Sequence, residues 1–219
     1  MAVRWIRSSA TLVTLLAALA GAGPASAGPP LLCEPFDTNG SPSLPWDSRH
    51  GWMGPRSDYD IRNLVADTQA LLTPETPVIA RMETLRRAAL YASADEAVAA
   101  RLLATLTERA GEGGKLTKTN ALARFDAAYF VETLRQIGTL GQDYRFGLRS
   151  DVVRRVIGDA DGYAQMREIL SVRTDPALEY AAALMVARRD PSAARVHTAK
   201  ARAGSRHDAL LARNLKPIS

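Results

Sequence analysis

The segment TPVIARMETLRRAALYAS, residues 76–93, shows a helical period that much of the chain repeats. Its apolar side chains recur at intervals of three and four residues, which places them on one face of an α-helix. Thr76 followed by Pro77 predicts where this helix begins, because threonine caps helices and proline suits the first helical position. The apolar stripe consists of Val78, Met82, Leu85, Ala89 and Ala92.

The same period extends over residues 59–219, which are therefore predicted to form one all-α domain. No stretch alternates apolar and polar residues for long enough to predict a β-strand. Asp-Pro pairs at residues 175–176 and 190–191 predict helix starts, and glycines at 111–114 and 204 predict helix ends. The expected helices span about residues 59–72, 78–93, 94–110, 120–137, 151–157, 161–172, 177–188, 191–204 and 208–215.

Helices of this length joined by short loops predict antiparallel neighbours. Both a bundle of helical hairpins and a short α-solenoid of the TPR or HEAT type satisfy that arrangement. Only scattered alanines, such as Ala182 and Ala201, match the pattern of about 34 residues that defines tetratricopeptide repeats. The sequence therefore leaves both architectures open.

Residues 28–58, called the arm below, differ from the helical part because they hold six prolines and four glycines. Proline at this density forbids long helices, yet the arm carries large apolar side chains. We therefore expect an extended arm packed on the helical core, with Trp46 and Trp52 as anchors and candidate binding residues. An Asn39-Gly40 turn is expected to reverse its direction midway.

The first 27 residues have the order of a secretory signal peptide. Arg4 and Arg7 precede an apolar run over residues 10–20, and Ala25-Ser26-Ala27 offers a cleavage site at its end. We therefore expect export to the periplasm or the extracellular space. The apolar run is about half of the ~20 residues that span a bilayer, which predicts no permanent membrane anchor.

Loss of the signal peptide lowers the formal net charge from +5 to +3. Nucleic-acid binding is not expected, because it needs basic side chains clustered on one face. The most basic stretch, residues 188–213, is interrupted by Asp190 and Asp208 and predicts a solvated helical surface. His197 and His207 within it are expected to be exposed or to cap helix ends.

Cys33 is the only cysteine, so the chain cannot form an intramolecular disulfide bond. Its thiol is expected to be free, modified or joined to a second chain. A lipoprotein is not predicted, because lipid attachment requires a small residue directly before the cysteine and Leu32 stands there.

Sequence motifs for phosphate loops, serine nucleophiles, zinc proteases, haem and CxxC sites are absent, and no cofactor or metal is predicted. The best constellation is Cys33 with Asp37, Asp47 and His50 in the arm. Cys33 and His50 are candidates for a nucleophile–base pair or for two metal ligands, because imidazole can accept the thiol proton. The alternative is that Cys33 packs as a small apolar side chain, and no catalytic residue is assigned.

Three arginines in residues 76–93 are candidates for binding an anion. Arg81 and Arg86, with Arg87, have the chemistry to recognise a carboxylate or a phosphate. The alternative is that they form a solvated helical face. Glu83 and Arg87 stand four residues apart, which predicts an ion pair along the helix.

Four segments of the chain stand out together. They are residues 32–36 (LCEPF), 43–46 (SLPW), 81–88 (RMETLRRA) and 175–184 (DPALEYAAAL). With them the chain resembles, over about residues 28–215, a group of uncharacterised exported all-helical proteins of bacteria. The resemblance implies export and an all-helical fold. It implies no activity, because none is assigned to that group.

These observations predict a non-enzymatic helical module that binds another envelope protein or a peptide in a groove between helical hairpins. The arm is expected to fill that groove or to help form it. The alternative is a thiol- or metal-dependent activity centred on Cys33 and His50. A third class is a structural envelope protein that self-associates.

Overall fold

The computed structural model describes residues 28–33, 35–111, 113–140 and 148–215. These residues form α-helices and short 3-10 segments and no β-strand, which confirms the all-α prediction. None of the described helices combines the length and the apolar character needed to cross a membrane. The expected signal peptide, residues 1–27, lies outside the described residues.

The arm contains two short helical elements, α1 (Pro30–Cys33) and η1 (Ser48–Met53), so it is less extended than predicted. The remaining elements are η2 (Ile61–Asn63), α2 (Leu64–Leu71), α3 (Val78–Ala92), α4 (Glu96–Ala110), α5 (Ala121–Gly138), α6 (Ser150–Ile157), α7 (Gly162–Val172), α8 (Pro176–Val186), α9 (Pro191–Gly204), η3 (Ser205–His207) and α10 (Ala209–Asn214). Each helix expected after residue 58 is therefore present, with bounds that differ from the prediction by a few residues.

Aspartates fix the starts of five of the helices in the described chain. At α4, Asp95 Oδ1 accepts hydrogen bonds from the backbone nitrogens of Ala97 at 2.9 Å and Val98 at 3.1 Å. Each such cap pairs backbone donors that a helix start leaves open, and contributes about 1 kcal/mol. The corresponding caps of α7, α8, α9 and α10 are Asp161, Asp175, Asp190 and Asp208.

The start of α3 differs from the prediction, because Thr76 does not cap the helix. Its hydroxyl donates a hydrogen bond to Leu71 O at 2.8 Å and accepts one from Thr73 N at 3.1 Å. Thr76 thus closes the turn between α2 and α3, and Pro77 takes the N-cap position without a side-chain hydrogen bond. The capping prediction was wrong because a threonine hydroxyl serves a turn as well as a helix start.

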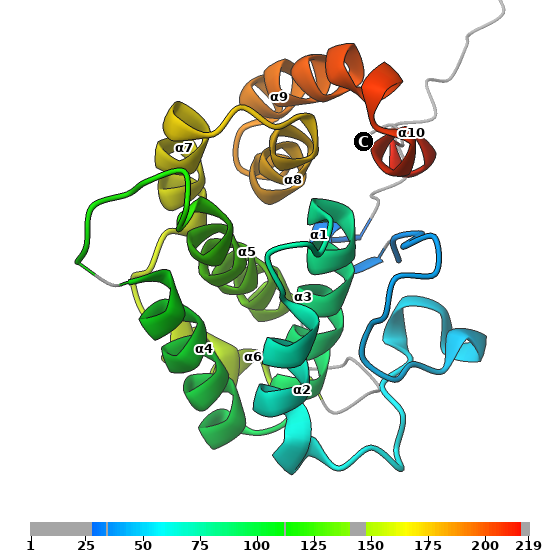
Figure 1. Ribbon diagram of the computed structural model, residues 1–219. Coiled ribbons are helices and arrows are strands. Elements are labelled where there is room, and N and C mark those ends of the chain that lie inside the picture. The colour runs from blue at the N-terminus through cyan, green and yellow to red at the C-terminus, as the bar shows by residue number, and fades with distance from the viewer. Residues whose placement is uncertain (1–27, 34, 112, 141–147, 216–219) are drawn as a thin grey trace, which may run out of the picture.

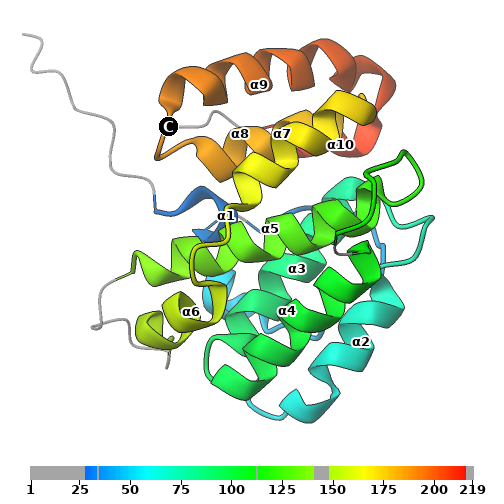
Figure 2. The same cartoon turned by 90° about the vertical axis from the view of Figure 1, so that its left-hand side faces the viewer.

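Helix α5 is the centre of a bundle (Figure 1). It contacts α1, α3, α4, α6, α7 and α8, and its residues Phe125, Tyr129 and Phe130 are fully buried. In an α-solenoid each repeat touches only its neighbours along the chain. A central helix that touches elements from both ends of the chain therefore makes the fold a bundle. Figure 2 shows α7, α8 and α9 on one side of α5 and α2, α3 and α4 on the other.

The close crossing of α5 and α7 depends on Gly162. A Cβ added there would lie 2.2 Å from Ala128 O and 2.9 Å from Glu132 Cγ, so the α5 backbone would have to move. We expect Gly162→Ala to lower the free energy of unfolding by about 1–3 kcal/mol, as overpacked sites do. Urea denaturation measures this loss, with Ser171→Ala at the exposed end of α7 as the control. Equal stability of the two variants would contradict the prediction.

The arm lies against α3 and reaches α10 near the C-terminal end (Figure 1). Its turn forms where predicted, because Asn39 and Gly40 have φ angles of 50° and 82° and Ser41 N donates to Thr38 O at 3.0 Å. Three arm leucines are almost fully buried in the core, which makes the arm part of the packed structure. They are Leu31, Leu32 and Leu44.

Candidate functional site

Buried charged side chains of α3 hold the main chain of the arm. Glu83 is fully buried, and its Oε2 accepts a hydrogen bond from Phe36 N at 3.0 Å. Arg86, also fully buried, donates from Nη1 to Leu32 O at 3.2 Å and to Trp52 O at 3.0 Å. Arg86 donates twice more to Glu83, at 2.8 Å each. The two charges therefore compensate each other where water does not reach them.

Arg87 and Tyr91 hold the next part of the arm. Arg87 Nε donates to Glu83 Oε1 at 2.6 Å, which confirms the ion pair predicted from their spacing, and Arg87 Nη1 donates to Leu44 O at 2.5 Å. The Tyr91 hydroxyl donates to Pro45 O at 2.7 Å. Because the two acceptors in the arm, Leu44 O and Pro45 O, are backbone carbonyl oxygens, Arg87 and Tyr91 fix the path of the arm.

The last helix also holds the arm. Asn214 on α10 donates from Nδ2 to Asp37 O at 2.9 Å and accepts from Asp37 N at 2.8 Å. Arg213 Nη1 lies 3.3 Å from Asp37 Oδ2. The arm is thus fastened to α10 as well as to α3.

The structure places Arg81 and Arg86 in the core, with 1% and 0% of their surface exposed. The predicted solvated face was wrong for both arginines, and their guanidinium groups face internal partners. Arg81 Nη1 lies 2.6 Å from Asp126 Oδ2, and Arg81 also donates to the carbonyl oxygens of Thr73 and Thr76. Arginine suits this task because its planar group donates in several directions at once.

Burial and ion pairing act against each other on two of these acids. Burial raises the pKa of Glu83, but hydrogen bonds and charge from Arg86, with the charge of Arg87, hold it below its ordinary value. At Asp126 burial dominates and raises the pKa to about 6, although Arg81 opposes the shift. Arg81 pairs with only one oxygen of this carboxyl group, and the other, Oδ1, is buried without a hydrogen-bond partner among the described residues.

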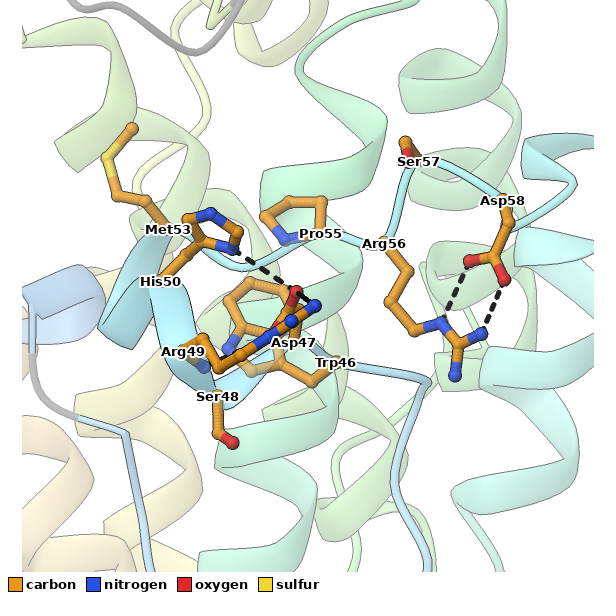
Figure 3. A pocket seen from close by; sticks show the side chains of 10 residues that line it. All are labelled: Trp46, Asp47, Ser48, Arg49, His50, Met53, Pro55, Arg56, Ser57 and Asp58. Atoms are coloured by element: carbon orange, nitrogen blue, oxygen red, sulfur yellow. Dashed lines mark hydrogen bonds and ion pairs between the residues drawn. The ribbon is translucent and has the colours of Figure 1, made fainter.

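An open pocket of about 830 Å³ lies in the arm, which supplies all of the described residues that line it (Figure 3). Its volume lies in the range of pockets that hold small molecules or side chains. Of the sequence candidates, Trp46 and His50 line this pocket, whereas Cys33 and Trp52 do not. We call it the arm pocket. Its lining residues are Trp46, Asp47, Ser48, Arg49, His50, Met53, Pro55, Arg56, Ser57 and Asp58.

Trp46 is held firmly in the wall of the arm pocket. The guanidinium carbons of Arg86 and Arg87 lie 4.8 Å and 5.4 Å from the Trp46 ring centre. The Tyr91 ring meets it edge-on, with ring centres 6.1 Å apart. Trp46 Nε1 donates to Gly51 O at 2.9 Å. The same arginines that fix the backbone of the arm therefore also fix its aromatic side chain.

Side chains of both charges form the polar wall of the arm pocket (Figure 3). Asp47 lies 2.8 Å from Arg49 Nη2 and 3.3 Å from His50 Nδ1, and Arg56 pairs with Asp58. Hydrogen bonds from Arg49 hold the pKa of Asp47 well below its usual range. The His50 side chain is 57% exposed. The arm pocket can therefore contact apolar and charged groups of either sign.

Cys33 and His50 occupy neighbouring elements of the arm, because α1 and η1 contact each other. Cys33 is partly buried and packs against the hydrophobic core, as the small apolar alternative predicts. The His50 imidazole pairs with Asp47. Within the described part of the chain, no group of three or more Cys, His, Asp and Glu residues is placed to hold a metal ion. A thiol-dependent activity stays a prediction.

A second polar cluster joins α7, α8 and α9, and the sequence did not indicate it. His197 is buried, so the prediction that it is exposed or caps a helix was wrong. Its Nδ1 lies 2.5 Å from Glu179 Oε2 and its Nε2 lies 2.9 Å from the Tyr163 hydroxyl. Lys200 Nζ donates to Glu179 Oε1 at 3.1 Å. Tyr163, Glu179 and His197 lie on three different helices, so no local motif could have identified the cluster.

Comparisons with protein-family models, with curated proteins and with solved structures find no match to this chain. The resemblance to exported helical proteins of bacteria stays a prediction. Function is therefore inferred from the arm, its attachment to α3 and its pocket.

Proposed function

We propose that this protein is an exported, non-enzymatic module that binds a peptide segment of another envelope protein in the arm pocket. The observation that supports this proposal is the attachment of the arm to two arginine side chains of α3, one fully buried and one half-buried. Arg86 and Arg87 hold both the carbonyl groups of the arm and the Trp46 ring. A pocket fixed in this way binds its ligand without first having to order its own wall, which favours affinity.

The composition of the arm pocket favours a partner that offers an apolar side chain flanked by charges. Trp46 supplies apolar surface, and the largely buried Met53 also lines the pocket. The side chains of Arg49 and Asp58 are 85% and 64% exposed and can pair with charges of either sign. Aromatic residues and arginine are also the types that most often carry the binding energy of protein interfaces.

Export is proposed from the composition of residues 1–27. We expect N-terminal sequencing of the protein from the periplasm or the culture medium to read Gly28-Pro29-Pro30. A chain that keeps Met1 and stays with the cytosolic fraction would contradict export, and with it an envelope partner.

The arm pocket can be tested in cells with a photo-cross-linking residue in place of Arg49. We expect one defined protein to be joined to this position and not to the same residue at Arg101, an exposed arginine on α4. Adding Asp58→Lys, which reverses an exposed charge at the arm pocket, is expected to reduce the adduct several-fold while leaving the helical CD spectrum unchanged.

Adducts of equal yield at positions 49 and 101, or none at position 49, would overturn the proposal. Mass spectrometry of the adduct identifies the joined chain. An adduct between two copies of this protein would instead support a self-associating structural protein.

A further inference from the structure

A second pocket, of about 400 Å³, lies away from the arm along the seam of α4 and α5 and reaches α7. Figure 2 shows α5 between α4 and α7. Three of its lining residues are buried apolar side chains, Ala110, Ala127 and Val131. The remaining lining residues are Leu103, Thr107, Gly113, Arg124, Ala160 and Gln165. We call it the seam pocket.

Arg124 is the charged side chain among the described residues that line the seam pocket. Its Nη2 donates to Gly111 O at 3.3 Å and to Gly114 O. Its Nε is buried, and among the described residues it has no hydrogen-bond partner and no carboxylate forms an ion pair with this arginine. A buried donor without an acceptor costs free energy, so an acceptor placed beside Nε would be stabilised.

We propose that the seam pocket binds a small organic monoanion with an apolar tail. The carboxylate would accept hydrogen bonds from Arg124, whose planar group matches carboxylate geometry. The tail would lie along Ala127 and Val131, which share one face of α5. Because the described residues that line it include no acidic side chain, the seam pocket favours an anion over a cation. This site is independent of the arm pocket and of a protein partner there.

The test uses octanoate as the probe, titrated into the full mature chain and followed by calorimetry and by amide chemical shifts. We expect saturable binding of one equivalent, with shifts concentrated on α4, α5 and the start of α7. Arg124→Gln is expected to weaken binding about 10- to 100-fold, because it removes a charge-assisted hydrogen bond. Thr107→Phe, at a half-buried wall position, is expected to abolish binding by filling the pocket.

Two controls distinguish recognition of the carboxylate from nonspecific hydrophobic binding of the alkyl chain. Arg101→Gln on the exposed face of α4 should leave octanoate affinity unchanged. 1-Octanol and octylamine should bind at least about tenfold more weakly than octanoate. If Arg124→Gln fails to fold by CD, Arg124→Lys keeps the charge, loses the planar fork and should show an intermediate affinity.

The proposal fails on any of three results. These are an affinity for 1-octanol equal to that for octanoate, equal octanoate binding by Arg124→Gln, Thr107→Phe and the unaltered protein, and the absence of saturable binding below about 10 mM octanoate.

Discussion

Replacing Arg86 with methionine is expected to lower the free energy of unfolding by about 3–5 kcal/mol. Methionine has a similar reach but no charge and no donor. The Leu32 and Trp52 carbonyl oxygens would each lose a hydrogen bond, and the buried Glu83 would keep Arg87 as its remaining cationic partner. A buried charge that loses its partner still bears the cost of desolvation, so the loss exceeds that of a surface ion pair.

A double-mutant cycle tests how much of this loss comes from breaking the buried pair of Arg86 and Glu83. Glu83→Gln alone should destabilise the protein, and the same change added to Arg86→Met should cost much less than it does alone, because the carboxylate has then already lost its buried partner. Urea denaturation followed by CD measures all variants. Arg62→Met is the control, since this exposed arginine pairs with Asp60 at the surface. If the double variant loses as much free energy of unfolding as the two single variants together, the proposed coupling of Glu83 and Arg86 is contradicted.

Fluorescence reports separately on the arm in these variants. Trp46 and Trp52 are the only tryptophans in residues 28–219, and both lie in the arm. A red shift of their emission in native Arg86→Met would show that the arm has loosened while CD still shows an intact bundle. The Arg62→Met control should keep the emission of the unaltered protein.

The helices could be predicted from the sequence because their signals are local. Asp190-Pro191 and Gly204 mark the two ends of α9, and the structure places its bounds at Pro191 and Gly204. The choice between bundle and solenoid had no such signal. It depends on α5 touching α1 and α8, whose sequences lie far from it on either side.

The burial of the α3 arginines could not be predicted in the same way. Helical periodicity assigns charged residues to a polar face, and Arg86 follows that pattern. Its environment is set by the arm, which covers this face and supplies the carbonyl oxygens of Leu32 and Trp52. The arm itself was predictable from its prolines and tryptophans. That Trp46 and His50 belong to the same segment was predictable too, because both lie within residues 28–58. That Arg56 and Asp58 complete the arm pocket depends on the folded path of the arm.

Asp126→Asn is expected to change how stability depends on pH. Burial raises the pKa of Asp126 from its ordinary 3.8 to about 6 in the folded protein, with Arg81 opposing the shift. Between these values the folded state holds a proton that the unfolded state has released. The contribution of Asp126 to stability therefore falls as pH rises through this window, by about 3 kcal/mol in all. Asparagine does not titrate, so it lacks this dependence.

The measurable quantity is the free energy of unfolding of the unaltered protein minus that of Asp126→Asn. We expect this difference to fall between about pH 4 and pH 7, because most of the proton release occurs there. Glu83→Gln supplies a control of opposite sign. The pKa of Glu83 is lowered in the folded state, so the corresponding difference should rise with pH. A difference for Asp126→Asn that also rises with pH would mean that the charge of Arg81 outweighs burial at this site.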